Sequence, residues 1–86
     1  MINVQIGSKY HCTVKCLHPR EHFLTVVIEP SSAGVPIFIR VYSDHDLVGQ
    51  EVSNPREVAA FLDQFSEMDA LDRNHLFQAA CVFLGN

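Results

Sequence analysis

Four side chains that could bind a metal ion lie close together near the start of the chain. They are Cys12, Cys16, His18 and His22, and they fall within eleven residues. Structural zinc sites use nitrogen and sulfur ligands at about 2.0–2.3 Å, usually with cysteines about two to four residues apart in a turn. A small zinc-binding domain with these ligands is therefore one hypothesis for this chain.

The spacing of apolar residues in the same segment predicts a strand rather than a turn. Apolar and polar residues alternate, as in a half-buried β-strand, and the apolar set is Ile2, Val4, Ile6, Tyr10, Cys12, Val14 and Cys16. In a strand, cysteines four residues apart lie about 13 Å from each other, too far to share one zinc ion or form a disulfide. We therefore prefer strand cysteines with surface histidines, and we expect neither a bound metal nor a cofactor.

A nucleophilic pair of Cys16 with His18 or His22 is the other chemistry that these residues could support. The sequence predicts no helix start after Cys16 and no oxyanion loop, so nothing in it activates a thiolate. It also contains no phosphate-binding glycine loop, no G-x-S-x-G and no H-E-x-x-H. We therefore expect no catalytic residue and a function that is not enzymatic.

Three strand patterns precede any helix pattern in the chain. Gly7 and Ser8 interrupt the first of them, and a tight hairpin at that point would mix apolar and basic residues on one face. A strand bent at Gly7 and a three-residue loop over residues 7–9 both remain, and we prefer the bent strand. Further strands are predicted over residues 22–29 and 37–42, and the first of these is apolar on both faces, as a central strand is.

The second half of the chain begins with an ambiguous segment, residues 43–53. Asp44, His45 and Asp46 are typical of a turn with capping side chains, and we expect Leu47, Val48 and Val52 to be tucked beneath it.

A helix follows this segment. Asn54 is suited to the cap position, Pro55 to the first helical position and Glu57 to the capping box, and apolar residues then recur with helical spacing as far as Phe65.

A second helix is predicted from Ala70 or Asp72 to Leu84, with Gly85 as its C-terminal cap. Its second half is apolar on every side, so it must be buried on several sides or covered in a dimer. A competing interpretation makes residues 81–84 a short final strand, because short apolar runs do not distinguish the two.

These elements predict a single α+β domain over residues 1–86. The architecture is a three- or four-stranded mainly antiparallel sheet followed by two C-terminal helices packed on one face. We expect Cys81 to be a small core residue. The predicted core is Val26, Ile28, Ile39, Val41, Phe61, Leu62, Phe65, Phe77, Ala80 and Phe83.

Composition places the chain among globular proteins. It has 86 residues, 48% of them hydrophobic and 19% charged, which is outside the range of disordered chains. No apolar run approaches the roughly 20 residues of a membrane span, and the segment after Met1 does not have the pattern of a secretory signal. With three cysteines, an odd number, we expect a complete small cytoplasmic protein with reduced thiols.

Charge is distributed unevenly along the chain. Residues 1–43 carry four basic and two acidic side chains, whereas residues 44–86 carry two basic and eight acidic ones, for a net charge of −4. Direct binding of nucleic acid is disfavoured, because too few basic residues share one face. Acidic residues near helix starts also complement the helix dipole and favour solubility, which is the alternative explanation.

An acidic face attracts basic partners and speeds their association. The leading hypothesis is a small protein–protein interaction module that docks this face on a basic, nucleic-acid-binding surface of a larger protein. By analogy of size and charge alone, it would be an inhibitor of the kind found in phages and mobile elements, such as the anti-CRISPR proteins. The alternative is a homodimeric structural or regulatory module held by the apolar final helix or an open sheet edge. The predicted partner-binding residues are Asp44, Asp46, Glu51, Asp63, Glu67, Asp69 and Asp72.

Overall fold

The computed structural model describes residues 9–31, 34–44 and 46–85, which form one sheet and two helices. The elements are β1 (Tyr10–Cys16), β2 (His22–Pro30), β3 (Ile37–Tyr42), β4 (Leu47–Val52), α1 (Pro55–Asp63) and α2 (Ala70–Leu84). All neighbouring strands are antiparallel and their order is β1-β2-β3-β4, so each strand pairs with the next one along the chain. The expected α+β fold, with two helices after the sheet, is confirmed.

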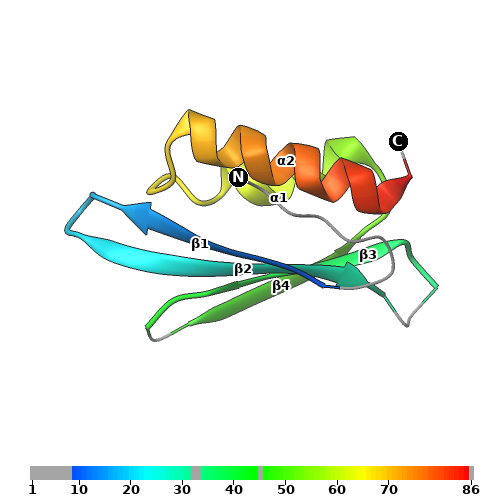
Figure 1. Ribbon diagram of the computed structural model, residues 1–86, viewed down its shortest axis with the longest axis horizontal. Coiled ribbons are helices and arrows are strands. Elements are labelled where there is room, and N and C mark those ends of the chain that lie inside the picture. Colours follow the sequence, from blue (N-terminus) through cyan, green and yellow to red (C-terminus); the bar gives the residue numbers. More distant parts are fainter. Residues whose placement is uncertain (1–8, 32–33, 45, 86) are drawn as a thin grey trace.

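The two helices lie as one layer over a single face of the sheet (Figure 1). The register defines this inner face, because Tyr10, Ile28 and Ile39 are cross-strand neighbours and all three are buried. Burial of apolar area between the two layers is the main force that holds them together. The core contains most of the residues predicted for it: Val26, Ile28, Ile39, Val41, Phe61, Leu62, Phe65 and Ala80.

Three predictions about core residues on α2 were wrong. Phe77 and Phe83 are only partly buried against the core, and Cys81 is half-buried. The reason is that α2 forms an outer layer and buries a narrow stripe, the residues Leu76, Ala79 and Ala80 at the spacing of one helix face. Apolar residues on either side of that stripe are therefore left at the margin of the core.

The predicted central strand and its neighbour agree with the sheet. β2 lies between β1 and β3, and β3 has the bounds that were predicted for it. The expected bend or loop at Gly7 and Ser8 lies outside the described residues.

The ambiguous segment over residues 43–53 contains a strand, β4. Val52 is buried as expected, but Leu47 is 58% exposed and Val48 36% exposed, so the prediction that both are tucked beneath a turn was wrong. The β3–β4 register explains the exposure of Leu47, because Leu47 pairs with Tyr42 on the sheet face without helices. Val48 pairs with Val41 on the inner face, where the helices leave it partly uncovered.

Helix α1 begins as the sequence predicted. The Asn54 side chain accepts a hydrogen bond from the Glu57 backbone N–H at 3.0 Å, and Pro55 occupies the first turn. The Glu57 carboxylate in turn accepts from the backbone N–H of Ser53 at 2.7 Å and from its hydroxyl at 3.0 Å. These contacts satisfy backbone donors that have no partner inside the helix.

Replacing Asn54 with alanine is expected to lower the free energy of unfolding by about 1 kcal/mol, because the cap acceptor is lost. Urea unfolding followed by circular dichroism measures the change as a lower midpoint at unchanged slope. Asn54→Asp is the matched control, since it retains the acceptor, and an equal loss in both variants would contradict the role of the cap.

Glu57 is expected to make stability depend on pH in the acidic range. The Ser53 backbone N–H and then its hydroxyl lower the pKa of the Glu57 carboxyl, so the charged form is favoured by folding. This contribution is present above the pKa of the unfolded chain and is lost as the pH falls through the lower folded value. The stability difference between the wild type and Glu57→Gln, measured by urea unfolding, should shrink on acidification, and a constant difference would refute the assignment.

Helix α2 runs to Leu84 and ends at Gly85, as predicted. Gly85 has a positive φ of 85°, a left-handed conformation that glycine adopts at low cost. The alternative of a short strand over residues 81–84 is wrong, because the helix continues through them. Among the described residues, no helix combines the length and the apolar character needed to cross a membrane.

Candidate partner-binding surface

Several charged side chains surround a hollow at one end of the sheet. The hollow has a volume of about 330 Å³ and is lined by Pro19, Arg20, His22, Ser43, Asp44, Asp46 and Glu67. These residues come from the β1–β2 connection, the start of β2, the β3–β4 turn and the α1–α2 loop. The antiparallel register brings the two hairpin ends to the same edge of the molecule, and the α1–α2 loop of the helix layer lies at that edge too (Figure 1).

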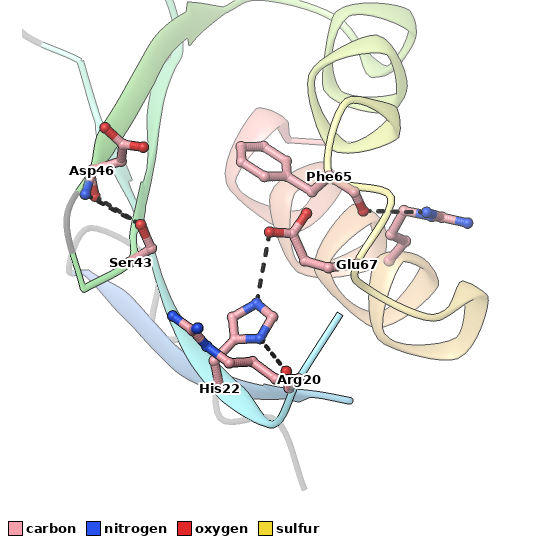
Figure 2. A network of polar contacts seen from close by, with 7 residues as sticks. Arg20, His22, Ser43, Asp46, Phe65 and Glu67 are labelled. Carbon is pink, nitrogen blue, oxygen red and sulfur yellow. Dashed lines mark hydrogen bonds and ion pairs between the residues drawn. The ribbon is translucent and has the colours of Figure 1, made fainter. Parts of the chain in front are cut away.

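His22 connects the sheet to the helix layer at this hollow (Figure 2). Its Nδ1 lies 2.7 Å from the Arg20 backbone oxygen, and because a carbonyl only accepts, Nδ1 is the donor. Its Nε2 lies 3.8 Å from a Glu67 carboxylate oxygen, a pair that is charged when the ring carries both protons. The ring is therefore oriented by its own connection and presents its other nitrogen to the α1–α2 loop.

The position of Glu67 is fixed by the loop that carries it. Phe65 and Met68 are buried on either side of Glu67 and anchor the loop in the core. Arg73 on α2 donates from Nη1 to the Phe65 oxygen at 3.4 Å and to the Met68 oxygen at 3.2 Å. This guanidinium thus satisfies loop carbonyls, and the loop holds Glu67 over His22.

The β3–β4 turn presents Asp44 and Asp46 beside the hollow. The Ser43 backbone N–H donates to the Asp46 oxygen at 2.8 Å, and the Asp46 N–H donates to the Ser43 hydroxyl at 3.2 Å. The turn uses backbone and hydroxyl groups for these bonds, so both carboxylates are left on the surface. Within the part of the chain that the structure describes, neither carboxylate forms an ion pair.

Two more carboxylates from the start of α2 join this group. Asp69 is the cap of α2, and its side chain accepts from the Asp72 N–H at 2.8 Å. Burial raises the pKa of the Cys16 thiol, and the charges of Glu67, Asp72 and Asp69 raise it further, so all three carboxylates act on one point of β1. Burial, followed by the neighbouring Asp69, also raises the pKa of the Asp72 carboxyl.

Glu67 therefore belongs both to the carboxylates that line the hollow and to those that act on Cys16. We call the combined set the acidic end: Asp44, Asp46, Glu67, Asp69 and Asp72. The other two predicted partner-binding residues lie elsewhere. Glu51 lines a separate hollow at the opposite end of β4, where it accepts from the Ser31 hydroxyl at 3.0 Å. Asp63 lies at the end of α1, beside the groove between the two helices.

The residues of the zinc hypothesis are only partly brought together. Cys16 and His22 are paired across β1 and β2, whereas Cys12 pairs with Val26 further along the strand. Among the described residues, no three histidine, cysteine, aspartate or glutamate side chains are arranged to hold a metal ion. His18 is exposed in the β1–β2 connection.

The surroundings of Cys16 also oppose a nucleophilic role. The thiol is buried, and burial together with the nearby carboxylates raises its pKa, which disfavours the reactive thiolate.

Sequence reasoning missed an apolar row on the outer face of the sheet. Tyr42 is the direct neighbour of Leu47 and of Thr25, and Phe23 follows diagonally on β2, where it is 53% exposed. The alternation of β2 and β3 could have indicated this row, but the position of Leu47 depends on the hairpin register.

The other half of the outer face is polar. Glu29 binds the Arg40 guanidinium and lies 3.7 Å from the Lys9 ammonium. Arg40 also donates to the Tyr42 hydroxyl at 3.3 Å and lies 5.3 Å from the centre of the Phe38 ring. The exposed apolar row is therefore confined to the half of the sheet that lies next to the acidic end.

Comparisons of the chain with protein-family models, with curated proteins and with solved structures found no match.

Proposed function

We propose that this protein is a non-enzymatic interaction module that docks its acidic end on a basic surface of a larger protein. The observation that carries the proposal is the convergence of carboxylates from the β3–β4 turn, the α1–α2 loop and the start of α2 on one end of the fold. Of the described arginines, Arg20 lines the hollow and Arg73 donates to loop carbonyls.

Gathering like charges is unfavourable for the isolated protein. The raised pKa of Asp72, due first to burial and then to Asp69, is one sign of this cost. A partner that brings lysine or arginine side chains to the acidic end relieves the repulsion and is attracted over a long range. The arrangement therefore favours association with a basic surface.

A basic surface of this kind is commonly one that binds nucleic acid. A small acidic protein that occupies it excludes the phosphate backbone and inhibits the larger protein. The more specific proposal, an inhibitor of the phage or mobile-element type, rests on the analogy of size and charge.

The test compares association before and after charge reversal at the β3–β4 turn. A partner is first identified by cross-linking to the wild-type protein in its native host, and its association rate is then measured by stopped flow at several salt concentrations. Asp44→Lys with Asp46→Lys should slow association by about tenfold or more and flatten its salt dependence. An unchanged rate would refute the proposal.

The matched control carries the same change in net charge at exposed positions outside the α1–α2 loop and the first turn of α2. It combines His11→Lys, Ala60→Lys, Gln78→Lys and Val82→Lys. This variant should retain most of the association rate. Equal slowing in both variants would mean that net charge alone, and not the acidic end, governs association.

The alternative, a homodimer through the final helix, has weaker support. Leu71 and Val82 are exposed and lie eleven positions apart, which places them on the same side of α2. Polar Asn74, His75 and Gln78 are exposed along the helix between them, so the side is not a continuous apolar patch. Light scattering at high protein concentration tests this alternative, and a monomer would exclude it.

A further inference from the structure

Strand β4 forms one edge of the sheet and leaves one side of its backbone open. Among the described residues, β4 pairs with β3 alone, and all of its residues except Val52 are exposed. An edge of this kind offers a row of N–H and C=O groups to any extended segment that can approach it.

The sequence of β4 contains few of the features that usually block such pairing. Natural edge strands are protected by charged residues, above all lysine, by proline or by bulges; β4 contains no lysine, arginine or proline, and its one charged residue, Glu51, lies near its end. The opposite edge strand, β1, does carry a charged residue of this type, the exposed Lys15. The two edges of this sheet therefore differ, and β4 is the open one.

Two exposed apolar side chains flank the backbone at the start of β4. Leu47 continues the apolar row of the outer face, next to Tyr42. Val48 pairs with the buried Val41 and so belongs to the inner face, but the helices leave it 36% exposed. A strand added along β4 would cover both side chains, one on each face of the sheet.

Gly49 does not disrupt this edge, because an aromatic ring covers it. A Cβ atom built on Gly49 would lie 2.8 Å from Cζ of Phe38, so the Phe38 ring lies directly over the glycine backbone. An aromatic side chain across a strand glycine supports an extended strand that would otherwise be weak.

The charges around β4 indicate the chemistry of the segment that pairs with it. Asp44 and Asp46 precede the strand, Glu51 lies near its end, and no basic residue lies on it. Basic side chains of an incoming segment would therefore be attracted, and its apolar side chains, which share one face when the two kinds alternate, would meet either Leu47 or Val48.

A second copy of the chain fits this edge less well than a basic segment does. Antiparallel pairing of two β4 strands about Gly49 would place Leu47 opposite Glu51 of the copy. This register would pair an apolar with an acidic side chain at both ends, and because neither strand carries a basic residue, two acidic edges would approach each other without charge complementarity.

We propose that β4 binds an extended segment of the partner that alternates apolar and basic residues, as an added antiparallel or parallel strand. This inference rests on the proposed function and adds the mode of binding: the acidic end attracts the partner, and the β4 backbone holds it. Main-chain hydrogen bonds would supply affinity, and the alternate side chains would supply selectivity.

The experiment uses the whole protein and two synthetic peptides of the same net charge. One alternates lysine and valine, and the other carries proline in place of two of the valines, which removes ladder donors. Binding is followed by the amide NMR signals of the protein and by hydrogen exchange. The alternating peptide should shift and protect the amides of β4 (Leu47–Val52) and should bind about tenfold or more tightly than the proline peptide.

A pair of protein variants separates pairing from simple attraction. Val48→Lys places a charge on the open edge and should weaken binding of the alternating peptide by about tenfold or more. Thr13→Lys adds the same charge at an exposed position of the β1 edge and should leave binding close to that of the wild type. Circular dichroism of both variants shows whether they remain folded, and the exchange data on the wild type do not depend on them.

The outcomes distinguish this inference from the proposed function. Shifts around Asp44, Asp46 and Glu67 without protection of β4 would overturn strand addition and leave acidic docking intact. Protection of β4 that persists in Asp44→Lys with Asp46→Lys would support pairing and count against the acidic end. Equal binding of the two peptides, no binding of either, or a dimer that Val48→Lys dissociates would overturn the inference.

Discussion

Replacing Phe61 with alanine is expected to lower the free energy of unfolding by about 3–5 kcal/mol. Phe61 is 1% exposed and joins α1 to the sheet, and its ring contacts Phe65 edge to face with centres 5.3 Å apart. The substitution removes apolar contacts from both layers and leaves a cavity that the close-packed neighbours cannot fill. For a domain of this length the whole free energy of unfolding is about 4–13 kcal/mol, so this one truncation would remove a large part of it.

Urea unfolding followed by circular dichroism and by tyrosine fluorescence measures this loss. Asp63→Ala is the control on the same helix, because Asp63 is exposed and should change the free energy of unfolding by no more than about 0.5 kcal/mol. A loss of less than about 1 kcal/mol for Phe61→Ala would show that the two layers are not packed through this ring.

The Cys16 thiol is expected to react with iodoacetamide about 10³-fold or more slowly than the thiols of Cys12 and Cys81. Cys16 is 1% exposed, while the other two are half-buried. Burial, and then the charges of Glu67, Asp72 and Asp69, raise the pKa of Cys16, so the thiolate is disfavoured even when reagent approaches. Modification therefore requires unfolding, and a stability of about 4 kcal/mol already corresponds to about 10³-fold protection.

Pulse labelling and mass spectrometry of the peptides give the three rates in one sample. The half-buried thiols are the internal controls, and unfolding in urea should bring all three rates within a small factor of one another. Similar reaction rates for Cys16 and Cys12 in the folded protein would contradict the burial of Cys16 in the core at the end of β1.

The elements that the sequence predicted well are those whose signals are local. The alternation along β1 and β3 and the cap residues Asn54, Pro55 and Glu57 depend on neighbours within a few positions, and the structure contains them. β4 was left ambiguous because its six residues are nearly all exposed and include Gly49, so no clean alternation marks it.

The candidate site could be predicted in composition but not in arrangement. The count of charged residues showed that the second half of the chain is acidic. That Asp46 and Glu67 line one hollow depends on the hairpin register and on how the helix layer lies over the sheet. The positions of Glu51 and Asp63, away from the other carboxylates, likewise depend on how the strands pair and how the helices pack. The half-buried Phe77 similarly follows from the orientation of α2, which no local pattern specifies.

The order of the elements along the chain has a consequence for biosynthesis. All four strands precede both helices, so the sheet leaves the ribosome before the layer that covers it. During that interval the inner face, with Val26, Ile39 and Val41, has nothing to pack against. Truncated chains that stop before α1 would expose this apolar surface and aggregate or recruit chaperones, so solubility depends on residues 55–84, which form the two helices.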